Sequence, residues 1–265
     1  MPMLHVNHVD LYFESHGPET GELVILNNGV FMNTGSWAFQ LPDLAKRYRV
    51  LAYDMRGQGQ SEHPESDYSL ELHAEDLVAL MDALGLAKAH MIGTSYGGEL
   101  NLLMGIRYPE RCHSLTIIAS VSHSDPLLVA MIERWRLAAM LGDGPKFFRL
   151  IYADTYSEGF LSDRPDLIPL AEQRYASLDL PAAVRLIESF QRFDVRADLG
   201  RIQVPTCIVS AELDLLKPRK YGELLHRAIA GSEFHLIPGA GHVVVLERAA
   251  EVNTVLLGFL AKHPL

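Results

Sequence analysis

Cysteine is scarce in this sequence, which has only two among its 265 residues. Cys112 and Cys207 cannot form the several bridges of a small secreted scaffold, so a disulfide framework is excluded. Both lie next to or within apolar, strand-like runs, which predicts two buried free thiols. Cysteine and histidine are nowhere grouped with the spacing of a zinc site, so we expect no bound metal.

Long apolar runs and an excess of basic residues are absent as well. No run reaches the length of a membrane span, and residues 1–5 lack both the basic region and the apolar stretch of a signal peptide. Lys and Arg number 23 against 33 Asp and Glu, and a chain with this net charge of −10 repels nucleic-acid phosphates and anionic membranes. We therefore expect a soluble, cytoplasmic protein with no nucleic-acid and no membrane partner, while a homodimer stays open.

Short strand-like runs alternate with amphipathic helical runs in the first half of the chain, without repeats or a low-complexity linker. The helical pattern at Ser69–Leu84 is followed by Gly85, a common helix stop. The expected strands are Leu11–Ser15, Leu23–Leu26, Val50–Tyr53, His90–Ile92 and Leu115–Ala119. Such alternation predicts the α/β class, with a mostly parallel sheet and helices on both of its faces.

The rhythm changes between about residue 124 and residue 199, where no convincing strand is found. Helical patterns at Leu127–Leu141 and Ala182–Phe193 are separated by Gly and Pro. Strands and helices then resume at Thr206–Ser210, Arg219–Ala230, Phe234–Ile237 and Ala249–Ala261. We predict a core formed by residues 1–123 and 200–265 and a helical cap formed by residues 124–199. In an open parallel sheet ligands bind beyond the carboxyl ends of the strands, so the cap would lie over the site as a lid.

The central motif is Gly-Thr-Ser-Tyr-Gly-Gly at residues 93–98, between a strand-like run and a helical run. A sharp strand-to-helix turn exposes the serine hydroxyl at a helix N-terminus, where negative charge is favoured. The turn brings strand and helix close together, so its flanking positions must be small, as Gly93 and Gly97 are. The motif predicts that Ser95 is a nucleophile.

A serine nucleophile needs a base, and His242 is the best placed of the chain's 12 histidines. It ends the loop Gly-Ala-Gly-His after the strand-like run Phe234–Ile237 and precedes the last helix. Most of the other histidines, among them His5, His8, His63, His73 and His263, are interpreted as ordinary surface or helix residues.

The acid that orients the base should follow a strand between the other two members. Asp214 does so, in a turn closed by Pro218, and Glu212 is a rival in the same loop. The order serine, acid, histidine is the one that this kind of sheet requires. We predict a catalytic set of Ser95, Asp214 and His242.

These motifs together resemble those of the α/β-hydrolase superfamily, over essentially the whole chain. Asn27–Val30 is similar to the family's His-Gly-x oxyanion loop, with Asn28 in place of the usual histidine, and residues 54–61 are similar to its Asp-x-Arg-Gly-x-Gly-x-Ser loop. The resemblance implies the α/β-hydrolase fold with a helical cap. It also implies an oxyanion hole formed by the backbone N–H groups of Val30 and Tyr96.

The chemistry that follows is cleavage of an ester, lactone or thioester through an acyl-enzyme on Ser95, with a small-molecule acyl substrate and no cofactor. A similar Asn-Gly loop occurs in 3-hydroxyacyl acyltransferases, and a related polar loop occurs in enol-lactonases. Acyl transfer to an alcohol or thiol therefore stays open, as does a slow-turnover receptor of the same fold. The expected substrate contacts are Asn28, Phe31, His123, Phe148 and Tyr152. The aromatic stretch at residues 147–156 either lines the pocket or packs the cap onto the core.

Overall fold

An eight-stranded sheet forms the centre of the molecule in the computed structural model, which describes residues 2–264. The strand order is β1-β2-β4-β3-β5-β6-β7-β8. Two antiparallel pairings at one edge join β1, β2 and β4, and every other neighbouring pair is parallel. The strands are β1 (Met3–Val6), β2 (Val9–His16), β3 (Leu23–Asn27), β4 (Arg49–Tyr53), β5 (Ala89–Thr94), β6 (Cys112–Ile118), β7 (Thr206–Ala211) and β8 (Glu233–Ile237). The predicted fold class, a mostly parallel sheet flanked by helices, is confirmed.

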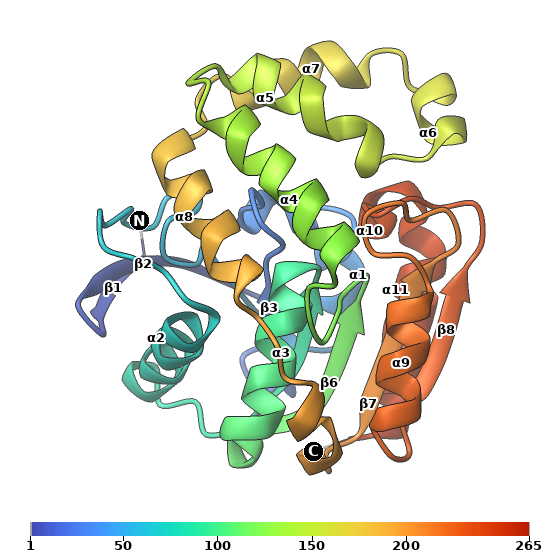
Figure 1. The fold of residues 1–265 in the computed structure, drawn as a ribbon. Helices are drawn as coiled ribbons and strands as arrows, with labels where there is room; N and C mark the ends of the chain where they lie inside the picture. The colour runs from blue at the N-terminus through green and yellow to red at the C-terminus, as the bar shows by residue number, and fades with distance from the viewer. Residues whose placement is uncertain (1, 265) are drawn as a thin grey trace.

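Helices cover both faces of this sheet, as Figure 1 shows. Side chains alternate between the faces of a strand, so Leu23 and Ile25 of β3 belong to one hydrophobic core and Val24 and Leu26 to the other. The first core is shared with α2 (Leu70–Ala83), α3 (Tyr96–Arg107) and α9 (Lys220–Ala228), and the second with α1 (Leu41–Leu44) and α11 (Ala249–Lys262). Burial on both faces explains why the central strands read as continuous apolar runs.

Local capping signals set the ends of the helices close to where the sequence places them. The Ser69 hydroxyl accepts a hydrogen bond from Leu72 N at 3.0 Å and caps the start of α2. Gly85 follows the helix with a φ of +66°. Sequence reasoning missed β1, a strand of only four residues of which Val6 alone is buried.

Five helices fill the segment without strands: α4 (Pro126–Ala139), α5 (Gly144–Ile151), α6 (Glu158–Asp163), α7 (Leu167–Tyr175) and α8 (Leu180–Gln191). They lie together at the top of Figure 1. The chain enters and leaves this segment side by side, because His123 and Asp194 form a β-bridge and Val195 N donates to Ser122 O at 2.9 Å. The shorter elements are η1 (Thr34–Trp37), η2 (Pro109–Arg111), η3 (Tyr152–Asp154), η4 (Arg196–Arg201) and α10 (Val244–Glu247).

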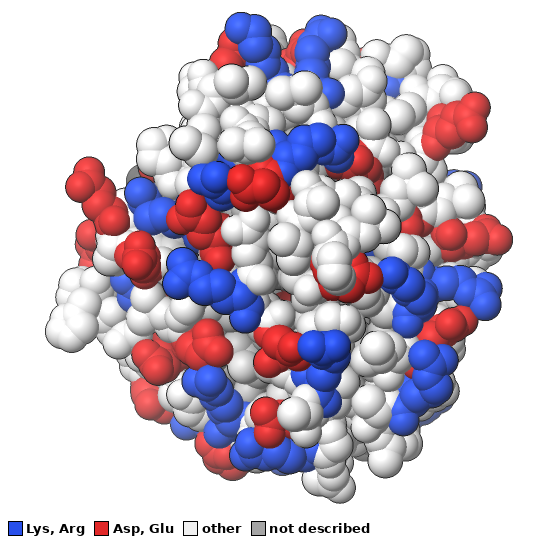
Figure 2. Space-filling model, in the orientation of Figure 1, with Lys and Arg blue, Asp and Glu red and all other residues white. Residues whose placement is uncertain are grey.

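The two cysteines are free and buried, and burial raises the pKa of each thiol to about 12. On the face drawn in Figure 2, Lys and Arg are interspersed with Asp and Glu rather than gathered in a patch of one sign. Between residues 2 and 264, no helix combines the length and the apolar character needed to cross a membrane.

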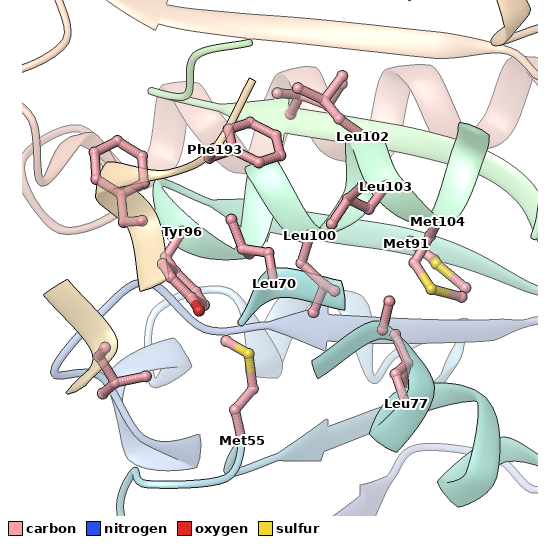
Figure 3. Packing of buried hydrophobic residues seen from close by; sticks show 14 of the residues in the cluster. Met55, Leu70, Leu77, Met91, Tyr96, Leu100, Leu102, Leu103, Met104 and Phe193 are labelled. Carbon is pink, nitrogen blue, oxygen red and sulfur yellow. The ribbon is translucent and has the colours of Figure 1, made fainter. Parts of the chain in front are cut away.

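His73 is a helix residue, as interpreted, but it does not lie at the surface: its side chain on α2 is buried against α3. Its Nδ1 lies 2.9 Å from the hydroxyl of Tyr96, and burial lowers the pKa of the imidazole to about 4. Figure 3 shows the Tyr96 ring turned into this packed layer, with Leu70 and Met55 close by.

Candidate active site

Ser95 occupies a strained turn between β5 and α3. Its φ of +51° and ψ of −117° are rarely adopted by a residue with a side chain, and such strain costs about 1–3 kcal/mol. A Cβ on Gly93 would lie 2.1 Å from Gly97 O, and a Cβ on Gly97 would lie 2.0 Å from Asn27 O. The flanking glycines are therefore required by the close approach of helix and strand, and the turn holds the Ser95 hydroxyl at the N-terminus of α3.

Three side chains from separate loops meet at this turn. Ser95 Oγ lies 2.9 Å from His242 Nε2, and His242 Nδ1 lies 2.8 Å from Asp214 Oδ2. The exposed fraction is 9% for Ser95, 6% for His242 and 3% for Asp214. The rival Glu212 does not join this relay, because its Oε2 accepts a hydrogen bond from Gly239 N at the exposed side of the loop. The arrangement matches a nucleophile, a base and an acid that orients the base.

The turn after β7 holds Asp214 through its second oxygen. Asp214 Oδ1 accepts hydrogen bonds from Leu216 N at 2.9 Å and from Lys217 N at 2.7 Å. Leu213 N donates to Ala240 O at 2.8 Å, which ties this turn to the histidine loop. The carboxylate and the imidazole are therefore positioned by backbone contacts as well as by each other.

The loop after β3 lies beside Ser95. A Cβ on Gly29 would be 3.5 Å from Ser95 Cβ, and Val30 lines the same cavity as Ser95. Tyr96 is the first residue of α3, where backbone N–H groups have no partner within the helix. Val30 therefore lies beside the nucleophile in space and Tyr96 follows it in the chain, and their role as oxyanion donors stays a prediction.

A cavity of about 360 Å³ opens onto Ser95 and His242. Its walls are mainly apolar and come from both the core and the segment of helices α4–α8. The core supplies Phe31 and Met32, and the helical segment supplies Trp135, Phe148, Ile151, Tyr156, Leu167, Leu170 and Tyr175. Such a space suits an apolar group of moderate size next to the reacting carbonyl.

The expected substrate contacts divide into two groups. Phe31 and Phe148 line the cavity. His123 and Tyr152 are placed elsewhere. The centres of the His123 and Tyr221 rings are 6.0 Å apart, and the Tyr152 ring stacks on the Phe148 ring with their centres 5.6 Å apart. His123 and Tyr152 do not line this cavity, because a position after a strand or on a helix does not decide which way a side chain points. Their contact with a substrate stays a prediction.

Asn28 does not line the cavity either. Its side chain is fully buried, its Nδ2 donates to Tyr53 O at 3.0 Å, and its Oδ1 accepts from Trp37 Nε1 at 2.7 Å. Both ends of the amide are thereby used within the protein. Asn28 shapes the loop before Val30 and does not face the cavity.

Sequence reasoning missed Lys217 and Glu99, which form a buried ion pair beside the nucleophile. Lys217 Nζ lies 2.9 and 3.0 Å from the two Glu99 oxygens and 3.1 Å from Ser95 Oγ. Two signals were available. Lys217 is a charged residue inside the turn between Asp214 and Pro218, and Glu99 is the acidic residue in the first turn of α3, whose other residues are largely apolar. Burial raises the pKa of Glu99, and the Lys217 ammonium opposes that rise.

Comparison with known proteins agrees with the fold. The family model for the alpha/beta hydrolase fold matches residues 22–249. The chain is 29% identical to "Putative carbamate hydrolase RutD" of Azorhizobium caulinodans over 98% of each protein. It is also 29% identical to 3-oxoadipate enol-lactonase 1 of Acinetobacter baylyi, over 94% of this chain and 92% of that one. The crystal structure of the enol-lactonase from Burkholderia xenovorans LB400 is 25% identical and superposes with a TM-score of 0.90 over 98% of this chain and 100% of that one. The chain is therefore an enzyme that belongs to the α/β-hydrolase family.

Proposed function

We propose that this enzyme is a serine hydrolase that cleaves a carboxylic ester, lactone or thioester through an acyl-enzyme on Ser95. The observation that carries the proposal is the relay of two hydrogen bonds, at 2.9 and 2.8 Å, from Ser95 through His242 to Asp214. A serine hydroxyl is a weak nucleophile unless a base takes its proton as it attacks. Such a base is in contact with Ser95 here, in a strained turn that opens onto a cavity.

The reaction would run in two halves. In acylation, Ser95 Oγ bonds to the acyl carbon while its proton passes to His242 Nε2, and the leaving group then departs with that proton. In deacylation, water bonds to the acyl carbon and gives its proton to His242, and Ser95 Oγ leaves with the proton returned. Asp214 would hold the imidazole and stabilise its cation. The N–H groups of Val30 and Tyr96 would bind the oxyanion, and one such donor is worth about 3 kcal/mol elsewhere.

The cavity favours a substrate with an apolar group of moderate size. The relative's name mentions a carbamate, and a carbamate without an apolar substituent would leave most of the roughly 360 Å³ of mainly apolar space unfilled. An ester or lactone with an alkyl or ring portion would use that space, and burial of each CH₂ group contributes about 0.8 kcal/mol. This size argument supports an esterase or lactonase activity.

Acyl transfer has less support than hydrolysis. The sequence argument for acyl transfer rested on the loop that contains Asn28. The Asn28 amide makes its hydrogen bonds to Trp37 and Tyr53 inside the protein. We therefore propose water as the acyl acceptor.

A fluorophosphonate probe tests the proposal directly, because it phosphonylates an activated serine. The wild-type protein should gain one label and hydrolyse p-nitrophenyl esters, and Ser95→Ala should do neither. Ser114→Ala is the matched control, since Ser114 on β6 is also buried but contacts His90 on β5. Labelling that persists in Ser95→Ala, or its absence in the wild type, would overturn the proposal. A panel of p-nitrophenyl esters and lactones of increasing acyl length would then rank the substrates.

A further inference from the structure

Ser95 Oγ has two polar partners, and only one of them belongs to the relay. The first is His242 Nε2 at 2.9 Å and the second is Lys217 Nζ at 3.1 Å. A lysine ammonium has three N–H donors and no acceptor. Ser95 Oγ must therefore accept the hydrogen bond from Lys217, which leaves its own proton free to point at His242. The lysine contact thus orients the hydroxyl for transfer of its proton to the base.

The ammonium is held in place from three directions. Its other donors reach both oxygens of Glu99, at 2.9 and 3.0 Å, and it lies 4.5 Å from the centre of the Phe190 ring. Glu99 in turn accepts from Val121 N at 2.9 Å, at the end of β6. The side chains of Lys217 and Glu99 are only 3% and 0% exposed. The long, flexible side chain of Lys217 is thereby fixed with its ammonium group in contact with Ser95 Oγ.

The same turn positions both groups that contact Ser95. Asp214 binds His242 with Oδ2 and accepts from the backbone N–H of Lys217 with Oδ1. One carboxylate therefore holds both the imidazole and the backbone from which the Lys217 side chain extends. Ser95 and Lys217 line a small recess, and its other lining residues are apolar: Val30, Ile132, Trp135, Ile187, Phe190 and Leu216.

Stability alone does not explain an ion pair in this position. Removing two charges from water is costly, and replacing a buried pair by apolar residues is often neutral or stabilising. A fixed positive charge in a poorly hydrated site acts strongly on neighbouring charge, since water does not screen it. Besides the two Glu99 oxygens, this charge acts on Ser95 Oγ, at 3.1 Å.

We propose that Lys217 is a fourth catalytic residue of this enzyme and that Glu99 is its positioning residue. As Oγ loses its proton to His242 and bonds to the acyl carbon, the ammonium stabilises the negative charge that develops on Oγ. In deacylation the bond from Oγ to the acyl carbon breaks, and the same contact stabilises the departing oxygen until His242 returns the proton. Lys217 keeps its three protons throughout, so no further co-reactant is needed.

The inference rests on the proposed acyl-enzyme at Ser95, and the two can fail separately. The informative variant is Lys217→Met combined with Glu99→Gln, because a single change would leave one buried charge without its partner. The new amide at position 99 can still accept from Val121 N, and the new thioether side chain at position 217 can fill the apolar space near Phe190. The matched control removes another buried ion pair, Arg56–Asp76 at 2.7 Å, by Arg56→Met with Asp76→Asn.

The readouts are the second-order rate of fluorophosphonate labelling, kcat and KM for a p-nitrophenyl ester, and the urea midpoint. A lost charge-assisted hydrogen bond to the reacting oxygen predicts that the labelling rate and kcat fall about 10- to 100-fold, with KM within about twofold. The Arg56/Asp76 control should lose stability but keep its labelling rate.

A labelling rate within about twofold of wild type in the Lys217/Glu99 variant would overturn the inference, as would an equal loss in the control. If that variant shows no cooperative unfolding, Lys217→Gln with Glu99→Gln keeps the hydrogen-bonding groups without the charges and is judged by the same criteria. A wild-type protein that takes no label would instead refute the acyl-enzyme itself.

Discussion

The Glu247 carboxylate holds Ser157 with both of its oxygens. Oε2 accepts from Ser157 Oγ at 2.5 Å and Oε1 from Ser157 N at 2.9 Å. Oε2 also accepts from the backbone N–H of Gly241 at 2.9 Å, and Gly241 immediately precedes His242 of the relay. One buried side chain therefore connects the loop of His242 to the start of α6, and the position of the helical segment is coupled to the base.

Glu247→Gln should weaken this connection and lower catalysis together with stability. The amide replaces one oxygen by a donor, so at least one charge-assisted hydrogen bond is lost, at a cost of about 1–3 kcal/mol in the free energy of unfolding. We expect kcat/KM for an ester to fall about tenfold as His242 becomes less well positioned. Urea unfolding and steady-state kinetics measure both effects. An unchanged kcat/KM in a destabilised variant would show that Glu247 only supports the fold.

Asp214→Asn should nearly abolish turnover, because an amide cannot stabilise the imidazolium and can favour the wrong tautomer. The expected loss in kcat is about 10³- to 10⁴-fold, with little change in the urea midpoint. Glu212→Gln is the matched control, since Glu212 contacts only Gly239 N in the same loop region and should be mild. The opposite ranking of the two variants would show that Glu212 is the acid.

The helical segment at residues 124–199 is predicted to select the acyl group, and two adjacent phenylalanines of α5 test this. Phe148 lines the cavity. Phe147 does not line the cavity and packs against Phe31, with the two ring centres 5.2 Å apart. Phe148→Ala should change kcat/KM unequally along an acyl-chain series, because one methylene in an apolar pocket is worth about 1–3 kcal/mol. Phe147→Ala should lower stability by about 3–5 kcal/mol and keep the chain-length preference. Equal preferences in all three proteins would exclude this wall of the cavity from substrate selection.

Acid should destabilise the protein in part through His73. Burial lowers the pKa of folded His73 to about 4, while a histidine in an unfolded chain titrates near about 6.5. The unfolded state therefore binds more protons between these values, so the free energy of unfolding rises with pH there and is lost as pH falls from about 6.5 to about 4. Between pH 7 and pH 5 the free energy of unfolding should fall by about 2 kcal/mol less in His73→Gln than in wild type. Urea unfolding at the two pH values measures this difference.

The matched change at the exposed His8 should keep the wild-type acid sensitivity. Burial also lowers the pKa of His90 to about 4, and His90 remains in all of these proteins. A residual acid sensitivity in His73→Gln is therefore expected. A loss as large as that of wild type would mean that His73 stays neutral in the unfolded chain or charges in the folded one.

The sequence by itself determined the fold class and the three residues that meet in the candidate site. Alternating apolar runs and capping residues are local signals. They depend on contacts between residues a few positions apart, and those contacts also form in the folded protein. Ser95 was recognisable because its turn requires Gly93 and Gly97 next to it. Asp214 and His242 were recognisable because each follows a strand and because their order is constrained by the sheet.

Only the tertiary structure decided which other side chains reach Ser95. Lys217 and Glu99 lie 118 positions apart in sequence, and their contact depends on how the turn after β7 packs over α3. Asn28 faces the interior because Trp37 and Tyr53 happen to present a donor and an acceptor to it. Phe148 points into the cavity while its neighbour Phe147 does not, since successive side chains on a helix project about 100° apart and long-range packing sets the rotation.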